Sequence, residues 1–291
     1  MIGEGRRTAP VQLDRRPAWC AAAAAAAAGL AAQIAYPLSA GALRDLLTVA
    51  VVLLFAGACA AHAVAGRGTR WAAAMVTVTA GGGLLAEFVG TATGFPFGGY
   101  VYTADGGLGP EVAGVPLLIG PAWTFGAYPA WCAARALVGS SVAVVPVAAW
   151  GLASWDLYLD PQMVADGRWS WEDATPALPG LPGIPLSNYA GWLVVALLMT
   201  AVLHALDRAS GTPRDGLPLA LFCWTWLGTA LAHAAFLDLP VSAAYGLVGM
   251  GVVGVPLLHK LALAPGVQRP WQIRQVPLRG RVPGPPARLR S

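Results

Sequence analysis

Three acidic residues stand at the ends of apolar stretches, where a carboxyl group can do acid–base chemistry. Glu87 lies near the end of one stretch, and Asp156 and Asp160 lie at the end of another. Because these aspartates are four residues apart, a helix places both carboxyl groups on one face, within a few ångströms of each other. Like charges so close in a partly dry place favour one group that keeps its proton. The pattern predicts a proton donor near neutral pH. The simpler alternative is a set of solvated helix-end acids, with Asp160 only capping the turn before Pro161.

The elements that must hold these carboxylates are helices inside a membrane. Of the 291 residues, 57% are hydrophobic and only 11% are charged, which is more apolar surface than one soluble domain can bury. A spanning helix needs about 20 mostly apolar residues. Such stretches lie at residues 18–36, 43–65, 71–90, 114–136, 142–159, 189–206, 217–237 and 241–259. The sequence therefore predicts an all-α fold, a polytopic transmembrane helix bundle of about eight spans.

The basic residues indicate the orientation of the bundle, because short loops rich in Lys and Arg stay cytoplasmic. With the N-terminus inside, all but Arg44 and Arg168 of the 18 Lys and Arg residues lie on inner segments. We therefore expect both termini in the cytoplasm (N-in/C-in), the carboxylates at the outer face, and a multi-pass protein of the cell inner membrane or plasma membrane. The same bias accounts for the net charge of +4 without nucleic acid as a partner.

The chain is expected to divide into three parts. Residues 1–17 form a cytoplasmic N-terminal tail, and residues 18–264 form a transmembrane catalytic domain that holds every candidate site residue. Residues 265–291 are rich in Pro and Arg, which predicts a disordered basic cytoplasmic tail that could touch anionic lipid.

Other residue types mostly exclude kinds of site. The four cysteines stand singly in apolar stretches without a C-x-x-C pair, so neither a disulfide nor a zinc site is predicted. The four histidines form no H-x-x-x-H or H-x-x-H-H motif, which excludes the di-iron chemistry of membrane desaturases, although His233 lies deep in its span and stays open. Gly81-Gly82-Gly83 lies inside an apolar span with no strand before it. This run predicts close helix packing by small residues, not a dinucleotide loop.

Two outer loops, residues 91–113 and 160–188, are too long to be mere connectors. Each ends in a similar motif, Gly-Val-Pro-Leu or Gly-Ile-Pro-Leu, with a tryptophan nine residues after the glycine, at Trp123 and Trp192. The two motifs form either a weak internal repeat or two helix starts with proline in the first turn.

The middle of the chain carries a set of distinctive motifs. They are Glu87-Phe-Val-Gly-Thr-Ala-Thr-Gly-Phe-Pro-Phe-Gly-Gly-Tyr100, Leu108-Gly-Pro, Gly114-Val-Pro, Pro121-Ala-Trp, Tyr128-Pro-Ala-Trp131, Trp155-Asp-Leu-Tyr-Leu-Asp-Pro-Gln-Met163, Gly167-Arg-Trp-Ser-Trp171 and Gly183-Ile-Pro-Leu-Ser-Asn-Tyr-Ala-Gly-Trp192. Together, over about residues 85–195, they resemble the membrane-bound carotenoid biosynthesis proteins that include the CruF-type carotenoid hydratases. The first two spans, the last two and the tail match only in hydrophobicity. Thr124-Phe125-Gly126 departs from the bulkier, Met-containing run of the family, which could alter the pocket and the substrate.

The resemblance implies addition of water across the terminal 1,2 (or 1′,2′) double bond of an acyclic carotenoid end. Protonation of this alkene at C2 leaves a tertiary cation at C1, and water captures it as a tertiary alcohol. The reaction needs a proton donor, a positioned water and walls that exclude bulk water. Glu87 or Asp156 is the candidate acid, and the other carboxylate or Asp160 orients the water.

Further residues are expected to bind the substrate or the water. Thr91, Thr93 and Asn188 are candidate partners of water or carboxylate, and Trp155, Tyr100 and Tyr189 are candidate wall residues. The expected partners are a lipid-soluble carotenoid, the lipid bilayer and other carotenoid-pathway membrane enzymes, with no cofactor, metal or nucleic acid.

Aromatic residues are expected to crowd the same outer face. They are Trp123, Trp131, Trp155, Trp169, Trp171, Trp192, Tyr100, Tyr102, Tyr128, Tyr158 and Tyr189. An interfacial aromatic belt explains about half of them. The others could line a pocket for a long polyene or steady a cation over their π faces.

Two other functions stay open from the residues alone. The spacing Asp-x-x-x-Asp near a membrane face also suggests a magnesium-dependent intramembrane prenyltransferase. A diphosphate wants basic residues beside such carboxylates, and Arg168 is the only one in either long outer loop. The second alternative is a non-enzymatic protein that binds pigment or transports a solute, since buried carboxylates also serve as proton relays.

Overall fold

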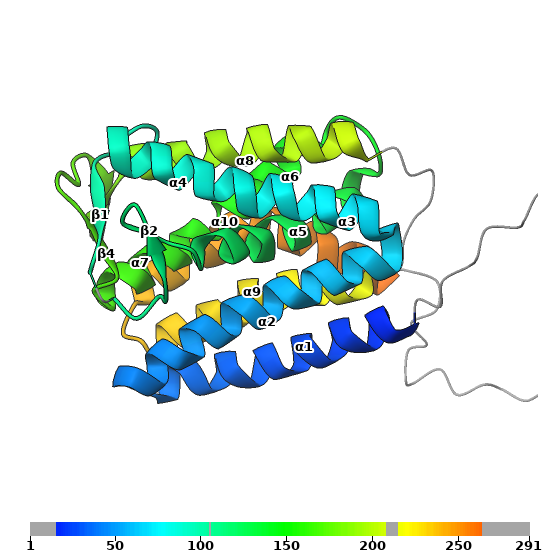
Figure 1. The fold of residues 1–291 in the computed structure, drawn as a ribbon, viewed down its shortest axis with the longest axis horizontal. Helices are drawn as coiled ribbons and strands as arrows, with labels where there is room; N and C mark the ends of the chain where they lie inside the picture. The colour runs from blue at the N-terminus through cyan, green and yellow to red at the C-terminus, as the bar shows by residue number, and fades with distance from the viewer. Residues whose placement is uncertain (1–15, 105, 208–214, 264–291) are drawn as a thin grey trace, which may run out of the picture.

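The computed structural model describes residues 16–104, 106–207 and 215–263. Its helices run along one common axis, and a group of short strands covers one end of the bundle (Figure 1). Most of the predicted N-terminal tail and the whole predicted tail 265–291 lie outside the described residues; Arg16 and Pro17 already belong to the first helix.

Every apolar stretch found in the sequence coincides with a helical segment. The helices are α1 (Arg16–Ala35), η1 (Tyr36–Leu38), α2 (Gly41–Arg67), α3 (Thr69–Val76), η2 (Thr77–Gly81), α4 (Gly82–Thr93), α5 (Ile119–Val138), α6 (Val144–Ala153), α7 (Asp156–Ala165), α8 (Leu186–Leu206), α9 (Gly216–Ala235) and α10 (Pro240–Leu263). The prediction of a helical bundle is confirmed.

Six helical segments of the described residues are long and apolar enough to cross a membrane, which makes the chain a membrane protein. They are Arg16–Leu38, Gly41–Arg67, Thr69–Thr93, Leu186–Leu206, Gly216–Ala235 and Pro240–Leu263. The other two predicted spans do not meet this description. Most side chains of α5 are buried within the protein, so this helix needs no continuous apolar surface toward lipid. The stretch 142–159 breaks after Ala153 into α6 and α7, each of 10 residues.

The described ends of the chain and two arginine ion pairs lie at the same end of the bundle. The first described residue of α1 and the last of α10 lie at the end opposite to the strands (Figure 1). At that end Arg67 pairs with Asp215 at 2.7 Å, and Arg135 pairs with Asp207. The arrangement places the described ends of the chain on one side, as an even number of crossings requires.

One expectation about the aromatic residues is wrong. Tyr128 and Trp131 do not join the aromatic group at the strand end. Arg67 lies 5.3 Å from the Tyr128 ring and 5.0 Å from the Trp131 ring, and it donates a hydrogen bond of 2.5 Å to the Tyr128 hydroxyl. The two rings therefore pack around a buried guanidinium at the opposite end, because α5 is long enough to carry aromatic residues to both ends.

The two long loops are held together by short antiparallel strands, which the apolar pattern does not reveal. The pairs are β1 (Tyr100–Tyr102) with β4 (Trp169–Trp171), β2 (Glu111–Val112) with β3 (Val115–Pro116), and β5 (Ala177–Leu178) with β6 (Leu181–Pro185). Tyr100 lies opposite Trp171, and Tyr102 lies opposite Trp169. Since alternate residues of a strand share a face, both tyrosines of β1 point the same way.

Glycines before Glu87 let this helix approach its neighbour closely. A Cβ atom at Gly83 would lie 2.4 Å from the Trp123 ring, so only glycine fits there. The predicted role in close helix packing is confirmed for Gly83, whereas a Cβ atom at Gly81 would meet nothing within 4 Å. The glycine run begins in the last residue of a π-helical stretch, η2, a local widening that is frequent near functional sites.

Candidate active site

Glu87 lies on α4, beneath β1, and is the acceptor of three hydrogen bonds. Its Oε2 accepts from the Tyr100 hydroxyl at 2.5 Å and from the Tyr102 hydroxyl at 2.7 Å. Its Oε1 accepts from Trp123 Nε1 at 3.2 Å. The side chain is buried, with 6% of the residue exposed. Three converging donors stabilise the charged form of a carboxyl group in such a place.

Asp156 and Asp160 lie on one face of α7, as their spacing predicts. Asn188 Nδ2 donates to Asp156 Oδ2 at 2.8 Å and also to Asp160 Oδ2. Trp169 Nε1 donates to Asp160 Oδ1 at 3.0 Å. The two carboxyl groups are buried and lie close enough for a direct hydrogen bond. Two buried acids in this position are most stable when they share one proton.

Asp160 does not cap a turn. It lies in the middle of α7, and Pro161 follows it inside the same helix. Its two oxygens are taken by side-chain donors from α8 and β4. The interpretation of Asp160 as a solvated helix-end acid is therefore wrong.

A small cavity lies beside Glu87 and Asp160. It has a volume of about 30 Å³, which suffices for a water molecule. Its lining residues are Glu87, Phe97, Tyr100, Tyr102, Ile119, Ala122, Trp123, Leu159, Asp160, Trp169, Trp171, Asn188 and Trp192. Glu87 and Asp160 thus face one water-sized space, whereas Asp156 lies behind Asp160 and does not line it.

Aromatic rings form most of the remaining wall. Trp123 and Trp192 stack with ring centroids 4.2 Å apart and planes 15° from parallel. These are the tryptophans of the two similar motifs, whose prolines end the strands β3 and β6 just before α5 and α8. The motifs therefore form corresponding elements on either side of the site, and the prolines precede the helices instead of lying in the first turn.

A larger apolar cavity adjoins the small one. Its volume is about 370 Å³, and it lies among α1, α2, α5, α7 and α9. Ile119, Ala122, Leu159 and Trp169 line both cavities. Trp155, a predicted wall residue, lines the larger cavity. The acids therefore stand at one side of an apolar space that can hold part of a hydrophobic ligand.

The structure brings some of the predicted binding residues to the site and leaves others away from it. Tyr100 and Asn188 hydrogen-bond to the carboxylates. Thr91 donates to the Glu87 backbone carbonyl at 2.9 Å, and Thr93 is exposed and donates to a backbone carbonyl of its own helix. Neither threonine lines a described cavity. The Tyr189 hydroxyl is buried without a hydrogen-bond partner among the described residues and lines neither cavity.

Sequence reasoning did not identify three of the donors to the carboxylates. Tyr102, Trp123 and Trp169 counted only as members of the aromatic group. The alternation in Tyr100-Val-Tyr102 and Trp169-Ser-Trp171 was the available signal, because it is typical of strands with one buried face.

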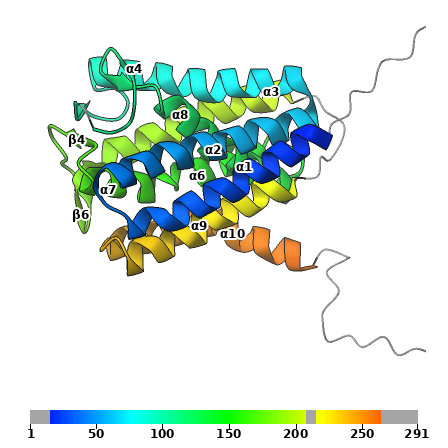
Figure 2. The same ribbon diagram turned by 60° about the horizontal axis from the view of Figure 1, so that its bottom comes forward.

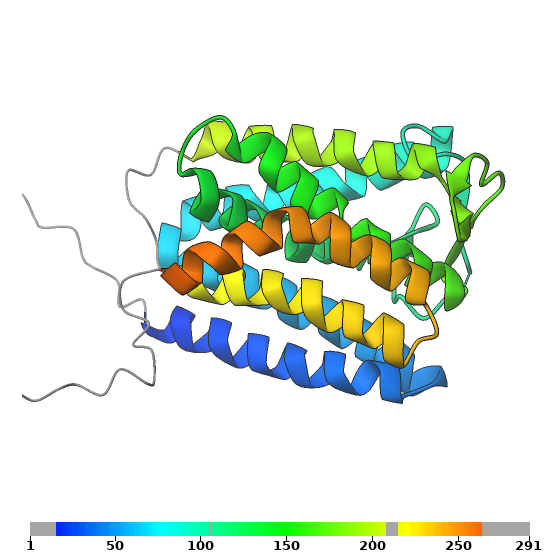
Figure 3. The same ribbon diagram turned by 180° about the vertical axis from the view of Figure 1, so that it is seen from behind.

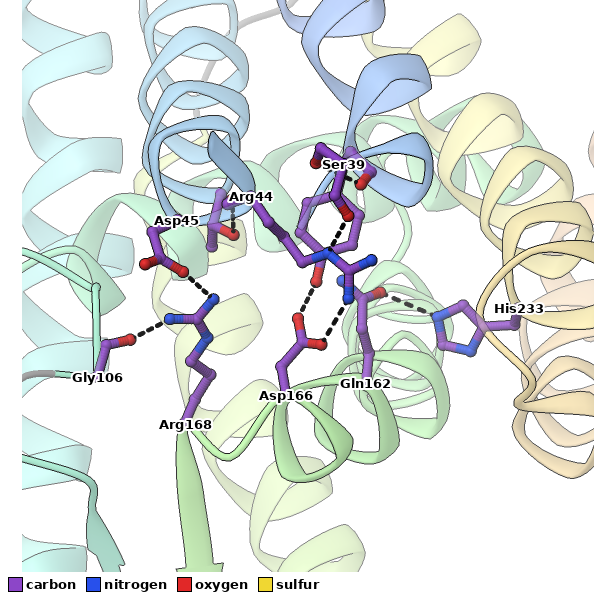
Figure 4. A network of polar contacts seen from close by, with 10 residues as sticks. Ser39, Arg44, Asp45, Gly106, Gln162, Asp166, Arg168 and His233 are labelled. Atoms are coloured by element: carbon purple, nitrogen blue, oxygen red, sulfur yellow. Dashed lines mark hydrogen bonds and ion pairs between the residues drawn. The ribbon is translucent and has the colours of Figure 1, made fainter. Parts of the chain in front are cut away.

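Two crossed ion pairs fasten α2 to the segment that follows α7 (Figure 4). Arg44 of α2 pairs with Asp166 at 3.1 Å, and Asp45 of α2 pairs with Arg168 at 2.5 Å. Arg168 also donates to the Gly106 carbonyl of the other loop. These contacts fix the segment that leads into β4.

The Arg168 contacts bear on the prenyltransferase alternative. The guanidinium is buried, is paired with Asp45 and does not line the small cavity. A diphosphate beside the acids would therefore lack the basic partner that it needs. Within residues 16–104, 106–207 and 215–263, no three His, Cys, Asp or Glu side chains are grouped to hold a metal ion.

His233, to which the sequence assigns no role, lies beside the larger cavity. Its Nδ1 lies 2.9 Å from the Ser242 hydroxyl, and its Nε2 lies 2.9 Å from Gln162 Oε1. Figure 4 shows the ring pointing from α9 toward Gln162 of α7. The histidine therefore orients a lining residue of the cavity and contacts none of the three acids.

Comparisons with known proteins agree with the motifs. Residues 47–253 match the model of a family described as carotenoid biosynthesis protein. The chain is similar to bisanhydrobacterioruberin hydratase of Haloarcula japonica, with 34% identity over 123 residues. This match covers 39% of the chain and 39% of that relative, well under half the length of either. No solved structure matches the chain.

Proposed function

The chain belongs to the family of carotenoid biosynthesis proteins, whose model covers residues 47–253, and on this premise we propose that it hydrates carotenoids. The reaction adds water to the terminal 1,2 (1′,2′) double bond of an acyclic end group. One observation carries the proposal: Glu87 and Asp160 line a single water-sized cavity that adjoins a much larger apolar one. The hydratase name of the relative supports the same reaction class.

Asp160 delivers the proton in this mechanism. Asp156 stands behind it, and Asn188 holds both carboxyl groups through one amide nitrogen. The pair shares one proton because two buried negative charges repel each other. When the end of the alkene reaches Asp160 from the adjoining larger cavity, its π electrons take the Asp160 proton at C2, a C–H bond forms there, and C1 becomes a tertiary cation.

Glu87 orients the water that captures this cation. This role requires the charged form of its carboxylate, which the three hydrogen-bond donors favour. The water oxygen bonds to C1, and Glu87 takes the proton that the water loses. The product is a tertiary alcohol. The proton then returns to the aspartate pair through a water in the same cavity. The addition changes no oxidation state overall, so it requires no redox cofactor.

The aromatic wall protects the cation. Faces of Trp, Tyr and Phe rings attract a positive charge without forming a bond to it. Trp123, Trp192 and Trp171 line the cavity. Apolar neighbours also keep bulk water from competing with the positioned water.

The membrane arrangement is also part of the proposal. The helices form about eight crossings, including α5 and the α6–α7 pair inside the bundle, with both termini in the cytoplasm. The acids then lie near the outer face of the cell inner membrane or plasma membrane. Five of the described Lys and Arg residues lie at the end opposite to the strands and two lie at the strand end, which agrees with this orientation. The five are Arg16, Arg67, Arg70, Arg135 and Lys260, and the two are Arg44 and Arg168.

The proposal is tested by expression in a host that produces lycopene. Pigments should gain the mass of one or two waters, and membranes that contain the protein, given unlabelled lycopene in heavy water, should place one deuterium at C2 of each hydrated end. Unchanged pigment masses, with the protein correctly inserted in the membrane, would contradict the proposed reaction. Pigment that copurifies unchanged would instead indicate a pigment-binding protein.

A further inference from the structure

The larger cavity is open at the side of the bundle, between α1 and α9. Its rim includes Ile34 and Leu38 from the end of the first helical segment, and Leu231 and Phe236 from the end of α9. All four residues are more than half exposed. Figures 2 and 3 show α1 and α9 side by side along this edge. Exposed apolar side chains on two spanning helices face the lipid, so the opening faces the lipid as well.

Farther from the strand end, one hydrogen bond joins these two helices. Trp224 Nε1 of α9 donates to Gln33 Oε1 of α1 at 2.8 Å. Both residues line the cavity. The opening is therefore bounded by this bond on one side and by the η1 turn on the other, where Tyr36 binds Asp166.

We propose that this opening is the entrance and binding site for the polyene chain of the substrate, which enters sideways from the bilayer. The end group reaches the acids past Ile119, Ala122 and Leu159, which line both cavities. The remainder of the polyene lies between α1 and α9 and extends into the lipid. The identity of the ligand rests on the proposed function. The path rests on the opening and on its continuity with the small cavity.

The lining chemistry favours a polyene over a polar ligand. The walls are mainly aliphatic and aromatic, with Phe125, Trp155 and Trp224 among them, and their polar members are uncharged. None of the Lys, Arg, Asp and Glu residues that the structure describes lines the cavity, so none of them would bind a charged head group there. A phospholipid acyl chain has the same apolar character, but its head group would have to stay at the membrane surface. Only a ligand that is apolar to its tip can reach the acids.

The test uses two substitutions on one helix. Ala232 lines the cavity and is half-buried, whereas Ala234 is exposed and lines no described cavity. Ala232→Phe should weaken binding of lycopene to the purified full-length protein at least about tenfold, because the ring fills the entrance. Ala234→Phe should bind like the wild type. Binding is read from the visible absorption of the retained polyene, which does not require turnover.

A second variant avoids any effect on folding. Leu38→Cys is inserted in the membrane first and then treated with a bulky maleimide, with treated wild type as the control for its exposed Cys20. The modified variant should lose polyene binding, and the control should keep it. Unimpaired binding in both Ala232→Phe and modified Leu38→Cys would overturn the inference.

The outcomes separate the entrance from the reaction. A wild type that binds lycopene through this opening but adds no water would uphold the entrance and refute the hydratase function. An Ala232→Phe variant that hydrates lycopene at the wild-type rate would refute the entrance and uphold the function. If bound phospholipid fills the site and lycopene does not displace it, the entrance assignment is overturned.

Discussion

Replacing Asp160 by Asn should abolish most of the activity, and the structure indicates how large the loss is. The substitution keeps the shape of the side chain and removes the proton that the mechanism transfers. Loss of a general acid typically costs about 10²–10⁴ in rate, which raises the barrier by about 2.7–5.4 kcal/mol. Asp156→Asn should cost less, because Asp156 does not line the small cavity. The sequence alone favours the opposite order.

Asp160→Asn also has a structural effect that must be separated from the chemical one. Both Asp160 oxygens accept hydrogen bonds, from Trp169 and from Asn188. An asparagine would turn its own amide hydrogens toward one of these donors, and a buried donor without an acceptor costs about 1–3 kcal/mol. Trp169→Phe removes one donor and keeps an aromatic wall. The double variant Asp160→Asn/Trp169→Phe should therefore recover stability but not turnover.

The assay measures hydrated carotenoid per unit of membrane-inserted protein, with solvent deuterium at C2 as the mark of proton transfer. Glu87→Gln should also lose about 10²–10⁴ in rate, because it removes the general base that takes the proton from the water. Glu111→Gln is the matched control, because Glu111 is an exposed carboxylate on β2. Near-wild-type turnover in both Asp160→Asn and Glu87→Gln would refute the carboxylate mechanism. Recovery of turnover in the double variant would refute the role of Asp160 as the acid.

Three further results are expected. Gly83→Ala should lower the free energy of unfolding in detergent by about 1–3 kcal/mol through overpacking against Trp123; Gly81→Ala, with nothing within 4 Å of the added atom, should not. Reporter fusions after Gly68 should read cytoplasmic and fusions near Gly107 outside, whereas a cytoplasmic signal at Gly107 would reverse the orientation. Turnover should survive chelators and anaerobic conditions, and a loss that Mg²⁺ restores would favour prenyl transfer instead.

The helices could be predicted from the sequence because lipid requires long apolar runs. The prediction failed where protein replaces lipid around a helix. Residues 142–159 form one continuous apolar stretch, yet the chain breaks between α6 and α7. Trp155 lies at this break and packs against Trp192 and Phe125. These contacts come from distant parts of the chain, so no local sequence pattern predicts them.

The acids were predictable for a different reason. A carboxyl group in an apolar stretch is costly wherever it lies, so Glu87 and Asp156 are conspicuous without a structure. Their hydrogen-bond donors are not conspicuous, because a tryptophan near a membrane face is ordinary. Pairing of β1 with β4 brings Tyr100 and Tyr102 together with Trp169, and this pairing joins loops that are far apart in the sequence.

The aromatic donors make acid strength and cation protection depend on the same side chains. Tyr100, Trp123 and Trp169 each hydrogen-bond to a carboxyl group and also line the small cavity. The N–H or O–H group of each ring donates a hydrogen bond to a carboxyl oxygen. The apolar surface of the same ring excludes water from the cation. Phenylalanine at any of these positions would keep an aromatic ring in the wall and would remove the hydrogen bond to the carboxyl group. Wall and acid strength can therefore be varied separately, and the proton transfer should respond to the loss of the donor even when the cavity keeps its shape.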